Sequence, residues 1–155
     1  VPGEWRLDVN PGSKATVAWV AEAGRGQVAS IDVESFSTEG GKHRVNLNLT
    51  AVPESLEGYS ELHLDLKGSL PQARVYLEAG SGERWRSPPL EVGSEWTTHT
   101  VPLRSFDHQV RRDGAWTTVA GAVPTGLTGV SVKLGDFMNP PDASGRVVVD
   151  ALGLR

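Results

Sequence analysis

Alternation of apolar and polar residues is the feature of this sequence that most limits its fold. Valine and leucine alternate with arginine and asparagine across residues 44–49, and the two-residue period returns at 61–67, 74–79 and 130–135. Because successive side chains of a strand point to opposite faces of a sheet, this period predicts strands with one buried and one solvated face. No segment keeps a helical period over three turns. The pattern therefore predicts an all-β chain.

Turn-forming residues divide the rest of the sequence into further short apolar runs. Clusters of glycine, proline and asparagine favour turns, because glycine accepts left-handed backbone angles and proline fixes φ. Between these clusters we expect strands at 5–9, 16–21, 27–36, 83–87, 96–102, 115–120 and 147–152. About ten short strands without intervening helices predict an antiparallel β-sandwich of the jelly-roll type. The length of 155 residues suits one such domain, spanning residues 1–155.

Charge and cysteine content exclude several classes of function. The 15 Lys and Arg against 19 Asp and Glu give a net charge of −4, which does not attract nucleic acid or an anionic membrane. No apolar run approaches the ~18 residues that a membrane-spanning helix needs. The absence of cysteine removes disulfides, thiol nucleophiles and thiolate metal sites. We therefore expect neither nucleic acid nor membrane as a partner.

Motifs for catalysis are weak. The sequence has no Gly-x-Ser-x-Gly turn, no close histidine pair and no phosphate-binding glycine loop. Asp65 and Glu78 are harder to set aside, because they would project from one face of two consecutive strands, as paired carboxylates of glycoside hydrolases do. No flanking apolar residues raise the pKa of either acid, which favours solvated or sugar-binding carboxylates. A small jelly-roll hydrolase or lyase remains an alternative.

The polar side of the predicted strands offers a candidate binding surface. If the strands share one sheet, that side combines planar hydrogen-bonding groups with a central aromatic ring: His63, Asp65, Arg74, Tyr76, Glu78 and Lys133. Sugars are recognised by such sets, because an aromatic ring stacks on the pyranose while arginine and carboxylate groups bind its hydroxyls. The surface therefore predicts a carbohydrate ligand, although any soluble sandwich has an outward polar face.

Tryptophan makes up five of the ten aromatic residues. Trp96 follows a polar turn and precedes a strand, which favours packing at the edge of the sandwich. Trp19, Trp85 and Trp116 lie near glycine turns, where a large ring reaches the rim of a groove or packs inward. Trp85, in the arm 83–86, is with Tyr76 the main candidate for a stacking platform.

The order of four segments resembles a known group of proteins. These segments are LEGYSELHLDLKG at 56–68, ARVYLE at 73–78, the run from Trp96 to Phe106, and RVVVDALGL at 146–154. Together they resemble the carbohydrate-binding modules of families 4, 9, 16 and 22, which have a galactose-binding-like jelly roll. The resemblance covers residues 59–155, and it lies in the order of strands and turns.

The resemblance implies a non-catalytic module that binds a β-linked polysaccharide or oligosaccharide, of the β-glucan, xylan or mannan class, on a concave sheet. Such a module targets a glycoside hydrolase in the same polypeptide, so we expect a secreted, monomeric domain from a larger enzyme. A start at Val1 without an initiator methionine agrees with that expectation. A structural or protein-interaction sandwich is the alternative from another class.

The same resemblance implies a structural Ca²⁺ ion. The family often holds calcium partly through an aspartate of the closing strand, which corresponds to Asp150. The Phe-Glu pair that usually supplies another ligand near the N-terminus is missing here. Calcium ligation and simple packing of Asp150 at the sandwich edge therefore remain open at this point.

Overall fold

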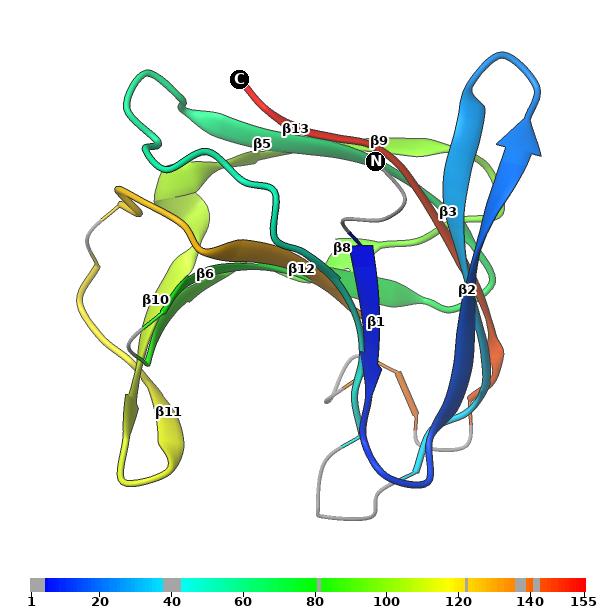
Figure 1. The fold of residues 1–155 in the computed structure, drawn as a ribbon, viewed down its shortest axis with the longest axis horizontal. Coiled ribbons are helices and arrows are strands. Elements are labelled where there is room, and N and C mark those ends of the chain that lie inside the picture. The colour runs from blue at the N-terminus through cyan, green and yellow to red at the C-terminus, as the bar shows by residue number, and fades with distance from the viewer. Residues whose placement is uncertain (1–4, 38–42, 81, 122, 136–138, 141–142) are drawn as a thin grey trace.

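The computed structural model describes residues 5–37, 43–80, 82–121, 123–135, 139–140 and 143–155. Within these residues, thirteen strands and one short 3₁₀ helix form two antiparallel sheets (Figure 1). No helix in the described part of the chain is long and apolar enough to cross a membrane. The prediction of an antiparallel β-sandwich is confirmed.

The larger sheet has eight strands. Its order is β1 (Trp5–Val9), β4 (Val45–Leu49), β12 (Gly129–Lys133), β6 (Gln72–Gly80), β7 (Glu83–Arg86), β10 (Asp107–Arg112) and β11 (Ala115–Thr118), and β8 (Leu90–Glu91) pairs with β6. Strand β10 was not expected from the sequence, because Asp-His-Gln-Val-Arg-Arg contains a single aliphatic residue. It forms because β7 and β11 pair with it on both sides.

The smaller sheet has five strands. Its order is β2 (Lys14–Glu22), β3 (Gly26–Ser35), β13 (Gly145–Leu154), β5 (Glu61–Gly68) and β9 (Thr97–Pro102), with the helix η2 (Leu103–Ser105) after β9. Only a glycine fits at the end of β5, because a Cβ at Gly68 would clash with the carbonyl oxygen of Arg146 on β13. This close approach lets the two strands stay paired to their ends.

The core fills the space between the sheets. Fully buried side chains from both sheets meet there: Leu47, Val75, Leu77 and Val132 from the larger sheet, and Ile31, Leu64, Leu66 and Val147 from the smaller. These are the apolar members of the alternating segments, and burial of their surface is the main favourable term in folding. The polar members consequently point away from the core on both sheets.

The larger sheet is strongly curved. Figure 1 shows it bending into an arch from β1 on one side, through β12 and β6, to β10 and β11 on the other, while the smaller sheet covers the convex side. We call the inner side of this arch, which faces away from the core, the concave face.

Candidate functional site

The concave face is a continuous polar surface, because residues paired across neighbouring strands point to the same side of a sheet. One row crosses six strands: Arg6, Asn48, Ser131, Tyr76, Arg86 and Asp107. A second row on one side contains Asp8, Asn46, Lys133 and Arg74. A third row on the other side contains Glu78, Arg84, Gln109 and Thr118. Strand register therefore gathers residues from distant parts of the chain on one face.

A stack of a cation between two aromatic rings lies near the middle of the concave face. The Arg84 guanidinium carbon is 4.6 Å from the centre of the Tyr76 ring and 4.0 Å from that of Trp116. Its Nε atom donates a hydrogen bond of 2.9 Å to Gln109 Oε1. Lys133 Nζ lies 5.2 Å from the centre of the Tyr76 ring. Cation–π contacts of this kind hold the rings and the guanidinium in fixed positions.

The two rings of this stack differ in exposure. Tyr76 is only 5% exposed, because Arg84 and Lys133 lie against it. Trp116, on the hairpin formed by β10 and β11, is half-buried. Trp116 is therefore the more exposed of the two rings. The expectation that Tyr76 is an open stacking platform is wrong, because its ring lies beneath Arg84 and Lys133.

Glu78 lies in a hollow of about 410 Å³ on the concave face, together with Arg6, Asn48 and Ser131. The expectation that neither acid has a raised pKa is wrong for Glu78: burial raises its pKa, and the opposing effects of Arg84, Lys133 and the Ser131 hydroxyl only partly offset that rise. A carboxyl group with a raised pKa accepts hydrogen bonds when ionised and also donates one when protonated. The hollow thus combines donors and acceptors suited to hydroxyl groups.

The concave face brings together five residues that the sequence singled out: Arg74, Tyr76, Glu78, Trp116 and Lys133. They come from β6, β11 and β12, which the sequence alone did not place side by side. The remaining residues singled out lie elsewhere.

The structure corrects the expectation for Trp85. Its side chain points into the core from β7 and is 4% exposed, and its ring stacks in parallel on His108 with centres 4.6 Å apart. The expectation that Trp85 is a stacking platform is wrong, because the alternation along β7 turns Arg84 and Arg86 to the concave face and Trp85 towards the core.

His63 and Asp65 are also corrected. The assumption that residues 61–67 and 74–79 share a sheet is wrong, because β5 belongs to the smaller sheet and β6 to the larger. His63 and Asp65 therefore lie on the outer face of the smaller sheet, the side away from the core. Asp65 and Glu78 point away from each other across the sandwich, so they do not form the carboxylate pair of a hydrolase.

The surroundings of Asp150 do not fit a calcium ion. Arg25 Nη1 lies 2.6 Å from Asp65 Oδ2 and 2.9 Å from Asp150 Oδ2, so the chain supplies its own cation between the two carboxylates. Ca²⁺ takes about six to eight oxygen ligands. Within the residues that the structure describes, no group of three or more His, Cys, Asp or Glu side chains is placed to hold a metal.

Arg25 joins several side chains on the outer face of the smaller sheet. Thr98 Oγ1 donates to Asp65 Oδ1 at 2.6 Å, and the Arg25 guanidinium lies 4.0 Å from the centre of the Trp96 ring. Burial opposes the shift, but the hydrogen bonds from Thr98 and Arg25 lower the pKa of Asp65. Trp96 thus packs on the outer face of this sheet, where Arg25 covers it.

Trp19 does not join the other candidate residues; with Trp5 it lines a separate hollow of about 260 Å³. Its ring centre is 6.2 Å from that of Trp5, with the planes tilted by 53°, and both rings pack against the core at the edge of the sandwich. Trp19 belongs to β2 of the smaller sheet, so it does not line the concave face. Its position reflects packing between the two sheets.

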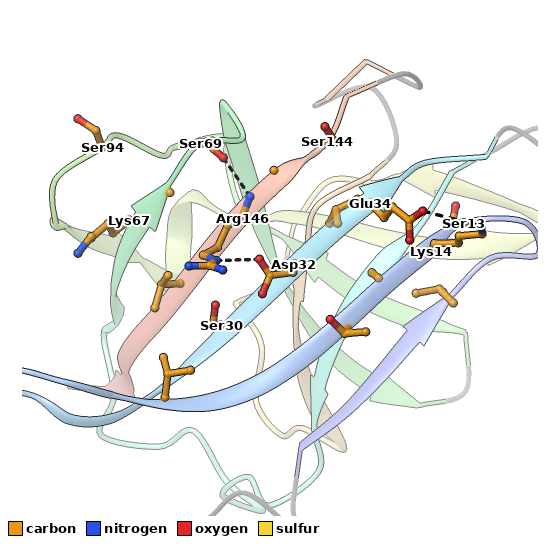
Figure 2. Close-up of a pocket in the computed structure, with 18 of the residues that line it drawn as sticks. Ser13, Lys14, Ser30, Asp32, Glu34, Lys67, Ser69, Ser94, Ser144 and Arg146 are labelled. Carbon is orange, nitrogen blue, oxygen red and sulfur yellow. Dashed lines mark hydrogen bonds and ion pairs between the residues drawn. The ribbon is translucent and has the colours of Figure 1, made fainter.

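A second hollow, larger than the one at Glu78, lies on the other side of the molecule. It measures about 910 Å³ and follows the outer face of β2, β3, β13 and β5. Figure 2 shows Arg146 pointing at Asp32, and the two side chains form an ion pair of 2.7 Å. Lys67 pairs in the same way with Glu22 at 2.9 Å. We call this hollow the outer groove; its described lining contains no aromatic ring and its main charges neutralise one another.

Sequence reasoning missed Arg84, Arg86, Gln109 and Arg6. The segment Glu83-Arg84-Trp85-Arg86 carried a signal for two of them, since a buried tryptophan at its centre places both arginines outward. Gln109 lies on the unexpected strand β10, and Arg6 is joined to the face only through the pairing of β1 with β4.

No protein-family model matches this sequence, and no curated protein does. Solved structures do. The family 11 carbohydrate-binding module of a cellulosomal cellulase of Clostridium thermocellum aligns with a TM-score of 0.71 at 14% identity, over 97% of this chain and 86% of that one.

Two further solved structures give the same result. The Clostridium thermocellum family 11 module in complex with a β-1,3-1,4-mixed-linked tetrasaccharide has a TM-score of 0.71 and 15% identity, over 97% of this chain and 88% of its own. A CBM4 structure has a TM-score of 0.58 and 15% identity, over 99% of this chain and 95% of its own. The fold is that of carbohydrate-binding modules.

Proposed function

We propose that this chain is a non-catalytic carbohydrate-binding module that binds a β-linked polysaccharide along its concave face. The observation that carries this proposal is the row of polar side chains across six strands, beside the Tyr76–Arg84–Trp116 stack. A curved surface with planar hydrogen-bonding groups matches a chain whose sugar rings present hydroxyls at their edges and C–H groups on their faces.

The residues of the face have distinct roles in this proposal. Trp116 stacks on a sugar ring, and Asn48 and Ser131 bind hydroxyls beside the hollow at Glu78. Arg84 is already fixed between two rings, so little of its conformational entropy is lost when a ligand binds. Affinity is expected to be modest, since sugar hydroxyls exchange good hydrogen bonds with water for similar ones with protein.

The wider context is also a proposal. One of the similar solved structures is a module of a cellulosomal cellulase, which supports attachment of this chain to a glycoside hydrolase in a secreted polypeptide. The placement of Asp65 and Glu78 on different sheets supports a binding role without catalysis. We propose that the module acts as a monomer.

Affinity gel electrophoresis with soluble polysaccharides tests the proposed function. Trp116→Ala should weaken retardation by about tenfold, because it removes the exposed ring of the stack. Trp96→Ala is the matched control, since it removes a half-buried tryptophan from the opposite sheet and should leave retardation unchanged. Loss of binding in Trp96→Ala with retention in Trp116→Ala would place the site on the other sheet.

A further inference from the structure

The hollow of about 410 Å³ at Glu78 lies to one side of the row that crosses six strands from Arg6 to Asp107. We call this row the central row. Asn48 and Ser131 belong to both the central row and the hollow, whereas Glu78 belongs to the row beside it. The central row runs past the hollow as far as Arg6 on β1. A polysaccharide that follows the central row therefore has the hollow at its side.

The lining of the hollow is suited to hydroxyl groups. Six polar side chains line it, from four strands or the residues next to them: Arg6, Asn48, Thr50, Glu78, Thr128 and Ser131. They include donors, acceptors and hydroxyls that act as both. Sites for small ligands usually measure about 300–1,000 Å³. The hollow thus has the size and the polarity for one sugar unit.

A glycine leaves the space for this hollow. Gly129 on β12 lies directly opposite Glu78 on β6 and lines the hollow with it. A side chain at Gly129 would point to the concave face, because residues paired across strands point to the same side. Gly129 does not have a positive φ, so its backbone conformation does not require glycine. Its Cβ would enter the hollow and lie 3.1 Å from the carbonyl oxygen of Leu49.

Hydrogen bonds fix the wall of the hollow at Glu78. The backbone N–H of Thr128 donates to the carbonyl oxygen of Glu78 at 2.7 Å, and Thr128 Oγ1 donates to the same oxygen at 3.2 Å. The Ser131 hydroxyl donates to the Glu78 carboxylate. An ionised carboxylate accepts stronger hydrogen bonds than a neutral group does. A ligand that binds here loses little free energy to ordering of the protein, because these groups are already held.

We propose that the concave face binds a branched polysaccharide, whose backbone follows the central row and whose single-sugar branch enters the hollow beside Glu78. This inference rests on the proposed function and adds the substrate class to it. It predicts neutral β-linked backbones with short branches, such as xyloglucan, galactomannan or arabinoxylan. The end of an unbranched chain is the less favoured occupant, because the central row continues past the hollow to Arg6.

Oligosaccharides that share a backbone and differ in their branches provide the test. We would compare cellotetraose with the xyloglucan heptasaccharide, mannopentaose with galactosylated mannopentaose, and xylotetraose with arabinosylated xylotetraose, by isothermal titration calorimetry. The branched member of at least one pair should bind about tenfold more tightly, because its extra sugar adds hydrogen bonds that each contribute modestly. Affinity electrophoresis with the matching polymers distinguishes a branch from a chain end, because a long polymer has many branches and few ends.

Gly129→Ala is the deciding variant, because it fills part of the hollow without changing a charge or a hydrogen-bonding side chain. It should reduce the preference for the branched member from about tenfold to about twofold or less. Gly93→Ala is the matched control in the loop between β8 and β9, where a Cβ would make ordinary contacts of 3.8 Å or more. It should keep the full preference.

Thr50→Leu is a second filling variant if Gly129→Ala fails to fold. Thr50 lies next to β4 on the opposite wall of the hollow and is exposed, so the substitution has little effect on folding. It should also lower the preference for the branched member. A preference that persists unchanged in either folded variant would overturn the inference.

The remaining outcomes separate the two proposals. Equal binding of branched and unbranched members in all pairs, by a protein that still binds β-linked polysaccharides, would overturn the inference and leave the proposed function standing. Tight binding of oligosaccharides without retention by the polymers would overturn it and assign the hollow to a chain end. Binding of no oligosaccharide and no polysaccharide would overturn both.

Discussion

The outer faces of the two sheets differ in how far their charged and polar groups are paired within the protein. On the smaller sheet, Arg25 pairs with Asp65 and Asp150, and the cations of the outer groove pair with neighbouring carboxylates. On the concave face, the buried Nε atoms of Arg74 and Arg86 have no hydrogen-bond partner among the described residues. The alternating sequence pattern does not distinguish the two faces, because it marks the polar residues of both sheets as pointing away from the core.

This difference indicates which of the two faces gains more free energy when a ligand binds. Charges that satisfy one another within the protein contribute to the fold and gain little from binding a further ion. Buried donors without a partner cost free energy in the unliganded protein, and a ligand that accepts hydrogen bonds from the Nε atoms of Arg74 and Arg86 would offset that cost. The larger hollow is therefore the less informative one, because its charges are already satisfied.

The largest effect on stability is expected beneath the concave face, at Trp85. Trp85→Ala removes a ring that is 4% exposed and stacked on His108, and should lower the free energy of unfolding by about 3–5 kcal/mol. Trp116→Ala should cost far less stability while reducing binding. Urea denaturation of both variants measures the contrast, and similar stability losses would contradict the assignment of Trp85 to packing and Trp116 to the ligand.

Removal of the cation on the smaller sheet should destabilise the protein in a pH-dependent way. The pKa of Asp65 is lowered in the folded state, so its ion pair stabilises the fold above the unfolded pKa of about 3.9 and loses that effect as the pH falls. Arg25→Gln should therefore lower the melting temperature at pH 7. The difference from wild type should shrink towards pH 3, as thermal unfolding across this range would show. A difference that stays constant with pH would contradict the ion-pair account.

Substitution of Glu78 should change stability in the opposite direction to substitution of Arg25. Its pKa is raised in the folded state, so the ionised carboxylate costs stability increasingly as the pH rises above the unfolded pKa of about 4.3. Glu78→Gln should unfold at a higher temperature than wild type at pH 7 and at nearly the same temperature at pH 3.5. Thermal unfolding of both proteins at pH 3.5 and pH 7 measures the effect, and a lower unfolding temperature for Glu78→Gln at pH 7 would contradict it.

The smallest effect concerns calcium. Because Arg25 supplies the positive charge between Asp65 and Asp150, treatment with EDTA should leave the melting temperature within about 1 °C of the untreated protein. Differential scanning fluorimetry with EDTA, followed by excess CaCl₂, measures this directly. A rise on calcium addition would show that the protein holds a calcium ion after all.

Strand positions followed from local pattern. The alternation at 44–49, 61–67, 74–79 and 130–135 corresponds to β4, β5, β6 and β12, because each of these strands has one face in the core. Strand β10 has one aliphatic residue and gave no such signal. Its existence depends on pairing with β7 and β11, which is a long-range property.

The candidate site followed only in part. The prediction that Arg74, Tyr76, Glu78 and Lys133 share one face is confirmed, because they are the polar members of two strands that pair in one sheet. Their part in ligand binding stays a proposal. His63 and Asp65 were misplaced because an alternating pattern is the same whichever sheet the strand joins. Trp85 was misplaced because a ring of its size packs inward as readily as outward.

The sequence by itself determined that this chain forms a β-sandwich, since a two-residue period leaves each strand one face to bury. It also determined which side chains of most strands point away from the core. Only the tertiary structure decided that β5 and β6 lie in different sheets, that Arg84 sits between Tyr76 and Trp116, and that Lys133 faces Arg74. The physical reason is that strand pairing joins residues far apart in the chain. A local period records which face a side chain occupies but not which strand lies beside it.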